Sequence, residues 1–499
     1  MKLNAEQQLA VETIDGPVLV VAGPGTGKTQ LLAARVENIL RQTDADPSNI
    51  LCLTFTNDGA RNMRERLRGI IGEASYKITV GTYHEFGAGI LRDYPEYFLE
   101  RRYLTLIDDL KSYRIFNGLT EEMSYANPLG YKEWGVIRSL VGNVKQAALT
   151  PDDLREIATE NKSAIFALER AANEIFPPRM PSKLEQALPL FNQWLGVLSA
   201  NNSPSTSPPS ANPAAGPLLP PPLAHVYLTD LKLAMAQAEA LGKATPLNKY
   251  KAEIMERVDD AYRLKAEKST ERLMALADVY EKYNNLTKAE GLYDYNDIIL
   301  AAIKAIEEYD DLRAELQEKY QYVLLDEYQD TNAAQSRIVE LLLDNPVWEG
   351  RPNVLAVGDD DQAIYAFQGA LSSNLTDFYR RYQDVKLINL SKNYRSAESI
   401  VDFAASFRQT IADSVYKGLA GRDKELVAAG AGGIAGGGRA VIERIDFKSD
   451  VAERNWVAER IKELLAAGER PSETAVLARY NSELESGAKQ LGGGKIRYQ

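Results

Sequence analysis

The chain has 499 residues, of which 45% are hydrophobic and 26% charged, the ordinary composition of a globular protein with about two to four domains. Its single cysteine excludes a disulfide framework, its two histidines argue against a histidine-built metal centre, and the absence of a membrane-length apolar run or signal-like start predicts a cytoplasmic protein without a membrane partner. The net charge of −12 argues mildly against a nucleic-acid partner, but local basic patches decide such binding and the sum does not.

Residues 18–29 carry the strongest chemical signal in the sequence. An apolar strand, predicted at 17–22, runs into AGPGTGKT, Ala22 to Thr29, and apolar residues then follow at helical spacing. Glycines allow backbone N–H groups to turn around a phosphate, and the N-terminus of the following helix adds a partial positive charge. We predict a phosphate-binding loop in which Lys28 reaches the terminal phosphates and the Thr29 hydroxyl ligates Mg²⁺. The complete GKT ending disfavours the alternative, a glycine-rich turn that binds nothing.

The next two strands, predicted at 50–55 and 77–81, end at motifs that can contact a nucleic acid. TFTNDGARNMRERLRG places Phe55 at a strand end, before a helix with a stripe of arginines that can follow phosphates, namely Arg61, Arg64 and Arg68. A solvated charged face is an equally good interpretation of that helix. In GTYHEF, Thr82 and His84 can contact a DNA strand, and a buried structural role is the alternative for His84. The alternation of strands and helices in residues 1–92 is typical of a parallel α/β sheet.

Residues 93–290 change character. They carry long amphipathic, charged stretches with almost no strand pattern, and we predict a large all-helical insertion domain. Within it, residues 201–222 hold eight prolines among Ser, Asn and Ala. That composition predicts a disordered loop, with a docking motif as the less favoured alternative.

The α/β pattern resumes near residue 291, with a buried strand predicted at 322–325. Asp326 and Glu327 follow at its carboxyl end, where parallel sheets bind ligands. We predict that Asp326 holds Mg²⁺ through water and that Glu327 orients and deprotonates the attacking water. A solvated Asp-Glu pair at the start of a helix is the alternative, which the preceding strand disfavours.

Two further strands, predicted at 354–357 and 385–390, complete the first α/β domain. After the first of them, Gln362 can hydrogen-bond a γ-phosphate, while Tyr365 and Phe367 offer flat faces that stack on unpaired bases. Taken alone, these two aromatics would more often be core residues. After the second strand comes LSKNYRS, which contains Tyr394 and Arg395: the guanidinium can reach a γ-phosphate, and the phenol ring can stack on a base.

From residue 391 we expect a second, partial α/β unit that extends to residue 499. Strands are predicted near 440–447 and 474–479, with a glycine-rich connection before them. The last residues, KIRYQ, resemble the start of another strand, so we expect this unit to be incomplete.

These motifs, in this order, resemble those of UvrD/Rep-type superfamily 1 DNA helicases. LNAEQQLAV is similar to the family's adenine-recognition motif, and AGPGTGKT, TFTNDGA, GTYHEF, GLYDYNDII, LLDEYQDTNAAQ, VGDDDQAIYAFQGA and LSKNYRS match successive motifs. The resemblance covers 1–92 and 291–400 closely, the insertion by size and position, and 400–499 weakly. It implies two RecA-like P-loop NTPase domains, with ATP between them and single-stranded DNA across the top. The first would comprise 1–92 plus 291–390, and the second 391–499.

The resemblance also implies roles for individual residues, with ATP and Mg²⁺ as cofactors. The implied nucleotide ligands are Gln7, which reads adenine, Tyr394, which stacks on it, and Ala22, Gly23, Pro24, Gly25, Thr26, Gly27, Lys28, Thr29 and Gln30. The implied catalytic residues are Lys28, Asp326, Glu327, Gln362 and Arg395, an arginine finger, with Thr29 and Asp326 at the metal. The residues implied to contact DNA are Phe55, Asn57, Thr82, His84, Tyr365 and Phe367.

The sequence departs from the family pattern at several points. Gln30 stands where many members have an arginine that packs on adenine, so weaker base stacking is expected. Phe367 replaces the usual tryptophan, and Gln368 replaces the usual arginine, which removes a charge near Glu327. The family's later motifs, including a second arginine finger, are not found, and we therefore expect this chain to bind ATP·Mg²⁺ but to hydrolyse ATP and unwind DNA poorly.

The sequence thus predicts an ATP-dependent 3′-to-5′ DNA helicase or single-stranded DNA translocase, acting in DNA repair or replication. Its predicted partners are single-stranded DNA and junctions between single- and double-stranded DNA. One alternative is a non-motor, ATP-dependent DNA-binding switch. Another is the motor subunit of a helicase–nuclease complex, which is less favoured because nothing in the sequence resembles a nuclease site.

Overall fold

The computed structural model describes residues 3–101, 104–130, 132–201, 223–364, 373–408, 418–419, 424–429, 441–480 and 483–484. The chain divides into two units, one of residues 1–396 and 401–435 and the other of residues 397–400 and 436–499. In the part of the chain that the structure describes, no helix is both long enough and apolar enough to cross a bilayer. The predicted loop at 201–222 lies outside the described residues, except for residue 201.

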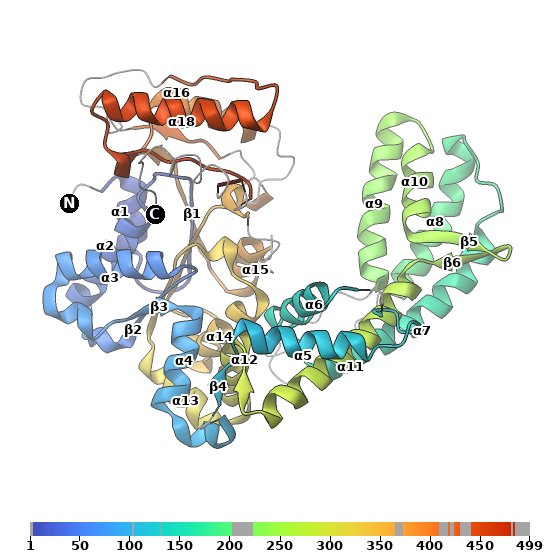
Figure 1. The fold of residues 1–499 in the computed structure, drawn as a ribbon, viewed down its shortest axis with the longest axis horizontal. Coiled ribbons are helices and arrows are strands. Elements are labelled where there is room, and N and C mark those ends of the chain that lie inside the picture. The colour runs from blue at the N-terminus through green and yellow to red at the C-terminus, as the bar shows by residue number, and fades with distance from the viewer. Residues whose placement is uncertain are drawn as a thin grey trace. The chain divides into compact units, whose positions relative to one another are not determined.

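A six-stranded sheet forms the centre of the larger unit (Figure 1). Its order is β10-β1-β9-β8-β2-β3, and every pairing in it is parallel. Four of the strands are buried along their whole length, as the near-continuous apolar runs of a sheet covered on both faces require. The predicted α/β fold with a parallel sheet is therefore confirmed, and its strands are β1 (Val18–Ala22), β2 (Ile50–Thr54), β3 (Thr79–Thr82), β8 (Tyr322–Leu325), β9 (Val354–Gly358) and β10 (Lys386–Leu390).

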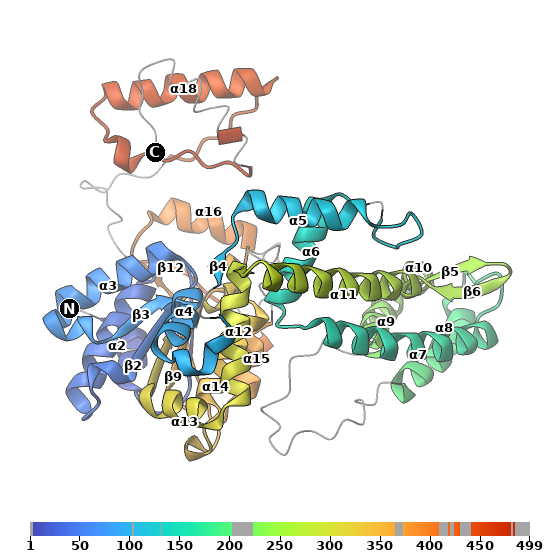
Figure 2. The same ribbon diagram turned by 60° about the horizontal axis from the view of Figure 1, so that its bottom comes forward.

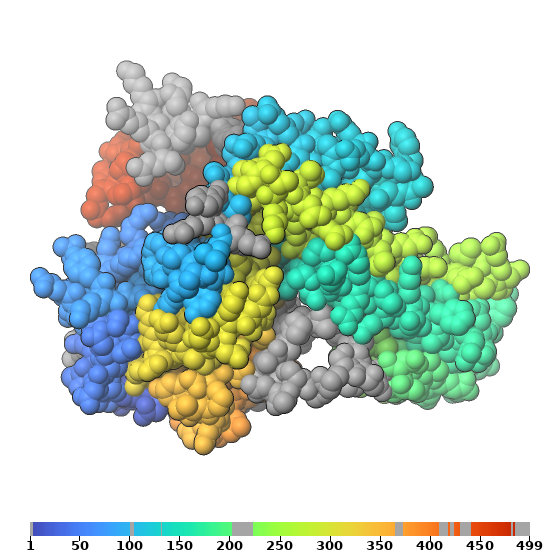
Figure 3. Space-filling model, turned by 90° about the horizontal axis from the view of Figure 1, so that it is seen from below, coloured from blue at the N-terminus to red at the C-terminus, as the bar shows by residue number. Residues whose placement is uncertain are grey.

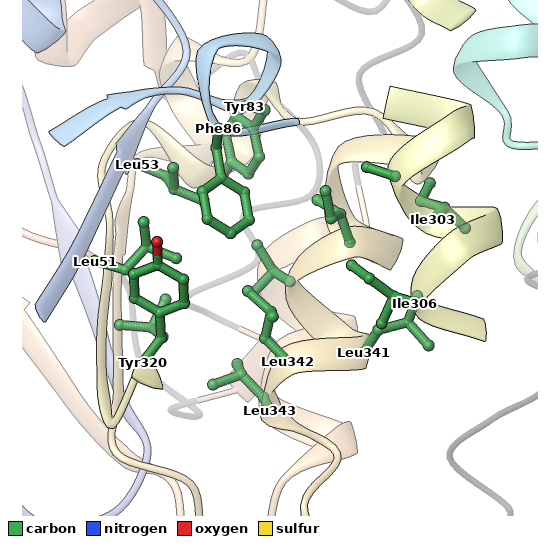
Figure 4. Close-up of a cluster of buried hydrophobic side chains, with 14 of the residues drawn as sticks. Leu51, Leu53, Tyr83, Phe86, Ile303, Ile306, Tyr320, Leu341, Leu342 and Leu343 are labelled. Atoms are coloured by element: carbon green, nitrogen blue, oxygen red, sulfur yellow. The ribbon is translucent and has the colours of Figure 1, made fainter. Parts of the chain in front are cut away.

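Successive residues of a strand point to opposite faces of the sheet, and in these strands both sets are apolar. Helices therefore cover both faces of the sheet. Val18 and Val20 of β1 join one core with helices α1 (Ala5–Glu12), α2 (Lys28–Gln42) and α3 (Asn57–Ile71). Leu19 of the same strand joins the other core (Figure 4), in which Leu51 and Leu53 of β2 lie beside aromatic side chains of α4 and leucines of α14. The helices of this second face are α4 (Tyr83–Asp93), α12 (Tyr295–Glu308), α13 (Asp310–Lys319), α14 (Ala333–Leu343) and α15 (Asn374–Arg381).

The insertion between β3 and β8 has two cores of its own and is mainly helical (Figures 1 and 2). In the space-filling view the insertion, coloured from cyan to yellow-green, extends to the right, away from the blue residues of the N-terminal part (Figure 3). The long helices α7 and α11 connect the two cores by packing along each other. The helices are α5 (Asp109–Glu121), α6 (Trp134–Gln146), α7 (Pro151–Ile175), α8 (Leu184–Ala200), α9 (Leu223–Leu241), α10 (Thr245–Ile254) and α11 (Ala266–Ala289).

Short strands interrupt the predicted all-helical insertion. β5 (Met255–Val258) and β6 (Ala261–Leu264) form an antiparallel hairpin, and β4 (Thr105–Leu106) pairs with β7 (Leu292–Tyr293). The hairpin turn consists of Asp259 and Asp260, both with positive φ, 48° and 64°. A two-residue turn of this kind matches the twist of the strands, and aspartate tolerates it better than most residues.

Beyond β10 the described chain forms short elements. β11 (Lys392–Asn393) pairs in parallel with β12 (Val427–Ala428), and α16 (Glu398–Arg408) lies between them in sequence. The smaller unit contains α18 (Asp450–Ala466). The strands predicted near 440–447 and 474–479 are wrong, because the described residues there, 441–447 and 474–479, form no strand. An apolar run becomes a strand only beside a hydrogen-bonded neighbour, and the described residues of this unit provide none.

Candidate functional site

The predicted motifs gather along one edge of the six-stranded sheet. Because the strands are all parallel, their carboxyl ends lie on the same side. The register aligns these ends: Ala22 lies opposite Leu390, Leu325 opposite Ala356, and Thr54 opposite Thr82. Across the sheet, this edge presents in turn the segments 391–396, 23–27, 359–362, 326–330, 55–57 and 82–84.

The loop after β1 has the backbone that a phosphate loop needs. Gly25 and Gly27 have φ of 70° and 84°, in the left-handed region that favours glycine, and Gly27 caps the N-terminus of α2. A Cβ on Gly25 would lie 2.7 Å from Cβ of Arg395 and 2.8 Å from Oδ1 of Asn393. The glycine at this position therefore allows the segment 393–395 to approach the loop closely, and N–H of Tyr394 donates to the Gly25 carbonyl at 2.8 Å.

Lys28, at the start of α2, forms an ion pair with Glu327. The distance between Nζ and Oε2 is 2.6 Å, and the Lys28 side chain is 11% exposed. Glu327 has φ of 49° and ψ of 43°, a left-handed conformation that costs a residue with a Cβ about 1–2 kcal/mol. Strained residues of this kind concentrate at functional sites. The structure thus brings two of the predicted catalytic side chains, Lys28 and Glu327, into direct contact. The backbone of Glu327 adopts an energetically disfavoured conformation at this contact.

Two buried carboxyls flank Glu327. Burial, followed by the Glu327 charge, raises the pKa of Asp326 to about 6, against the opposing effect of Lys28. The same two causes raise the pKa of Asp330 to about 6, and Asp330 Oδ1 has no hydrogen-bond partner among the described residues. A hard divalent cation would relieve both features, because it prefers oxygen ligands and carries the missing positive charge. The site therefore fits Mg²⁺, which Asp326 and Thr29, in the first turn of α2, would hold.

A buried glutamine that the sequence did not single out, Gln329, links two of these strand ends, those of β8 and β9. Its Nε2 donates to Oε2 of Glu327 at 2.9 Å and to Oδ2 of Asp330 at 3.0 Å. Its Oε1 accepts from N–H of Asp359 at 2.9 Å, and Asp359 in turn accepts a hydrogen bond from Nε2 of Gln362. The predicted γ-phosphate sensor is thereby connected to Glu327 and Lys28. A glutamine two residues after Glu327 gave no sequence signal of this role.

The residues predicted to contact adenine lie beside the same loop. Gln7 is buried, and its Nε2 donates to the Thr26 carbonyl at 2.9 Å while its Oε1 accepts from N–H of Asn4 at 3.0 Å. The hydroxyl of Tyr394 accepts from Nδ2 of Asn4 at 3.0 Å. Arg395 is exposed immediately after it. The predicted adenine residues and the predicted arginine finger are therefore neighbours of the phosphate loop.

A second site lies where β2 and β3 end. It is a cavity of about 300 Å³ whose walls include four of the residues predicted to contact DNA. The ring of His84 stacks on Tyr295, with centroids 4.2 Å apart and an interplanar angle of 24°. The Thr82 hydroxyl accepts from N–H of Glu85 and caps α4, so it helps to fix the wall. The lining residues are Phe55, Thr56, Asn57, Thr82, His84, Gln146, Tyr295, Asn332 and Gln335.

Two polar atoms at this cavity lack a hydrogen-bond partner within the described chain: Nε2 of His84 and Oε1 of Gln146. Burial lowers the pKa of His84 to about 4, so the ring is neutral at pH 7. The sequence reading missed Gln146 and Tyr295. Tyr295 lies within the GLYDYNDII motif, which offered a signal, whereas Gln146 comes from the insertion and offered none.

Buried Lys145 fixes the part of the cavity wall that these two residues form. Its Nζ lies 2.6 Å from Oδ2 of Asp294 and 2.7 Å from Oδ1 of Asp297, and its side chain is fully buried. Lys145 precedes Gln146 on α6, and Asp294 precedes Tyr295 on α12. The ion pairs thus join the insertion to the sheet domain at the cavity.

The remaining predictions near this site have mixed outcomes. Tyr365, Phe367 and Gln368 lie outside the described residues. Arg64 is occupied within the protein, since its guanidinium donates to the Val80 carbonyl and pairs with Glu85 at 3.0 Å. For this arginine the geometry favours a structural role over the phosphate-tracking stripe.

Comparisons with known proteins show the family of the chain. Residues 3–383 match the model of the UvrD/REP helicase N-terminal domain, and residues 388–499 match that of the UvrD-like helicase C-terminal domain. The ATP-dependent DNA helicase PcrA of Staphylococcus epidermidis is 26% identical over 485 residues, which are 96% of this chain and 48% of that protein. PcrA of Staphylococcus aureus is 27% identical over 418 residues, 84% of this chain and 41% of that protein. The chain spans about half the length of the curated relatives it matches.

Proposed function

This chain belongs to the UvrD/REP helicase family, and we propose that it acts as an ATP-dependent 3′-to-5′ DNA helicase or single-stranded DNA translocase. The observation that carries the proposal is the position of one short segment, residues 326–335. Glu327 pairs with Lys28 at the phosphate loop, while Asn332 and Gln335 line the cavity with the His84–Tyr295 stack. A single segment thus touches both a nucleotide site and a base-sized site, as a protein that couples hydrolysis to strand movement requires.

Without nucleotide, Lys28 pairs with Glu327 instead of with a phosphate group. An incoming triphosphate offers Lys28 a stronger partner, and Glu327 is then released to accept a proton from the attacking water. Mg²⁺, held by Thr29 and Asp326, would neutralise charge on the β- and γ-phosphates. Gln362 would donate to the γ-phosphate, and Arg395 would stabilise the charge that develops on it.

At the cavity, single-stranded DNA is the ligand that the lining fits. The rings of Phe55 and Tyr295 line the cavity, and stacking of an unpaired base on an aromatic ring contributes about 1–3 kcal/mol without sequence preference. His84 and Gln146 have unused polar atoms that a base edge or a phosphate can satisfy. We propose junctions of single- and double-stranded DNA as the physiological substrate, in repair or replication.

The test is ATP turnover with and without single-stranded DNA, for the wild type and the Lys28→Ala and Glu327→Gln variants. We expect a low ATP turnover in the wild type that DNA stimulates, and no stimulation in either variant. Wild-type turnover in both variants would refute the catalytic assignment. Duplexes with 3′ and 5′ tails then decide the direction, since a 3′-to-5′ enzyme displaces only the strand of the 3′-tailed substrate. DNA-stimulated hydrolysis without translocation would instead indicate an ATP-dependent DNA-binding switch.

A further inference from the structure

A buried lysine from a distant part of the chain, Lys424, lies at the centre of three aspartates. The carboxylates of Asp359, Asp360 and Asp361 converge within 4.8 Å of one another after β9. Nζ of Lys424 donates to Oδ1 of Asp359, and it lies 3.1 Å from Oδ2 of Asp361 and 3.8 Å from Oδ1 of Asp360. Lys424 is 2% exposed and Asp359 is fully buried.

This ammonium occupies the position that a bound cation would otherwise take. Three converging carboxylates repel one another strongly in a buried site, and a single positive charge among them offsets much of that repulsion. Burial alone would lower the pKa of Lys424, but the aspartates outweigh it and raise the pKa above its usual value. The lysine is therefore charged, and the cluster is held by the protein's own cation.

Asp359 connects Lys424 to Gln362, because its carboxylate accepts hydrogen bonds from both side chains. Oδ1 of Asp359 accepts from Lys424 and, at 3.2 Å, from N–H of Asp361, while Oδ2 accepts from Nε2 of Gln362. Both carboxylate oxygens are thus engaged, and the orientation of the Gln362 amide depends on that of Asp359. The N–H of Asp359 is held separately by Gln329, so the side chain is the part that Lys424 controls.

The segment that carries Lys424 also lies against the phosphate loop. A Cβ on Gly23 would lie 3.0 Å from Cδ1 of Leu426, and β12 follows directly. N–H of Val427 donates to the Ser391 carbonyl, and N–H of Ala429 donates to the Asn393 carbonyl, each at 2.8 Å. Residues 424–429 therefore connect the β9 loop, the phosphate loop and the segment before Arg395.

We propose that Lys424 is a positioning residue for triphosphate recognition, which holds Asp359 so that the Gln362 amide is presented to the γ-phosphate. This inference rests on the proposed ATP-dependent function. In this role Lys424 does not touch the nucleotide itself; it acts through Asp359 and Gln362. Loss of the lysine should weaken the preference for ATP over ADP, because only ATP has the γ-phosphate that Gln362 would contact.

The experiment measures the dissociation constants of ADP·Mg²⁺ and of the slowly hydrolysed ATPγS·Mg²⁺ by calorimetry, so it does not depend on turnover. The variants are Lys424→Met, Gln362→Ala, their combination, and Lys386→Met as the control, which removes an exposed charge from the amino end of β10. We expect Lys424→Met and Gln362→Ala each to reduce the preference for ATPγS about tenfold, the loss of one hydrogen bond to a charged group. The double variant should lose no more than either single variant, and the control should match the wild type.

The outcomes separate the two proposals. If the wild type binds neither nucleotide, the proposed function itself fails and this inference fails with it. If the wild type prefers ATPγS and Lys424→Met retains that preference, or if the losses in the double variant multiply, Lys424 does not act through Gln362. If Lys424→Met binds ADP as tightly as the wild type does, the rest of the nucleotide site is intact. If Lys424→Met loses its affinity for ADP as well, the role of Lys424 is purely structural. Lys424→Arg, which retains the charge, should keep at least half of the preference, and a loss as large as that in Lys424→Met would also overturn the inference.

Discussion

Two sites lie at the carboxyl ends of the sheet strands: the nucleotide edge, around the phosphate loop and Glu327, and the aromatic cavity, around His84 and Tyr295. They differ in how many of their polar atoms have hydrogen-bond or ion-pair partners within the protein. At the nucleotide edge, two lysines are paired with carboxylates, Lys28 with Glu327 and Lys424 with Asp359, although Oδ1 of Asp330 has no partner among the described residues. At the cavity, Nε2 of His84 and Oε1 of Gln146 have no hydrogen-bond partner among the described residues. Under the proposed function, the nucleotide edge must release Lys28 from Glu327 to accept a triphosphate, whereas the cavity offers polar atoms that are already available.

Under the proposed function, this difference indicates how each of the two proposed ligands is recognised. A polyphosphate has enough charge to displace an internal ion pair, so the paired state protects the site when no nucleotide is bound. A base is nearly neutral and cannot repay such a loss, so its site consists of ring faces and unused polar atoms. Substitutions at the nucleotide edge should therefore change catalysis most, and substitutions at the cavity should change DNA affinity and stability.

The largest expected effect is that of Glu327→Gln. Loss of the base should lower the ATP turnover number about 10²–10⁴-fold, while ATP binding persists or tightens because Lys28 loses its internal partner. DNA-stimulated turnover and calorimetry measure the two quantities. Glu308→Gln, an exposed change on α12, is the control. Loss of ATP binding in Glu327→Gln would show that the ion pair between Lys28 and Glu327 is needed for the structure of the nucleotide site.

Lys145→Met should produce the largest loss of stability at the cavity. Removal of the buried ammonium leaves Asp294 and Asp297 without their cation, and we expect a loss of about 3 kcal/mol in the free energy of unfolding, measured in urea. The affinity for single-stranded DNA should fall with it, while ATP affinity should stay within about twofold. Lys304→Met, on the exposed side of α12, is the matched control. An equal loss of ATP and DNA affinity would contradict the separation of the two sites.

The stability of the cavity wall should depend on pH through His84. Burial lowers its pKa to about 4, below the usual 6.5, so between these values the unfolded chain binds a proton that the folded chain does not. The free energy of unfolding should therefore fall as the pH is lowered through this window, by up to about 3 kcal/mol. His84→Gln should flatten the dependence. Parallel curves for the wild type and His84→Gln would show that His84 protonates freely in the fold.

Tyr295→Ala should have the smallest effect of the four, confined to DNA. Removal of the ring that stacks on His84 should weaken single-stranded DNA binding by about 1–3 kcal/mol, measured by fluorescence anisotropy at one fixed salt concentration. Tyr309→Ala, which removes a ring outside the cavity, is the control. Unchanged DNA affinity in Tyr295→Ala would remove the cavity from the proposed base site.

The sequence alone determined the strands of the central sheet and the phosphate loop, because both are local. A four- to five-residue apolar run and a glycine-rich turn before a helix keep their meaning in most surroundings, and β1, β8 and β9 lie where the pattern predicted them. Local patterns were insufficient where a strand needs a partner, as the missing strands at 441–447 and 474–479 and the unforeseen hairpin β5–β6 show.

Only the tertiary structure decided which polar side chains meet. Gln329, Lys424 and Gln146 are ordinary polar residues in the sequence, and each becomes part of a site through contact with a segment that is distant in the chain or on a neighbouring strand. A hydrogen bond or ion pair depends on atoms within a few ångströms, and the strand order β10-β1-β9-β8-β2-β3 sets those distances. The order depends on the packing of all the strands between the two helical layers, with β1, β2, β8 and β9 buried along their whole length, and this is a property of the whole sheet that no single motif contains.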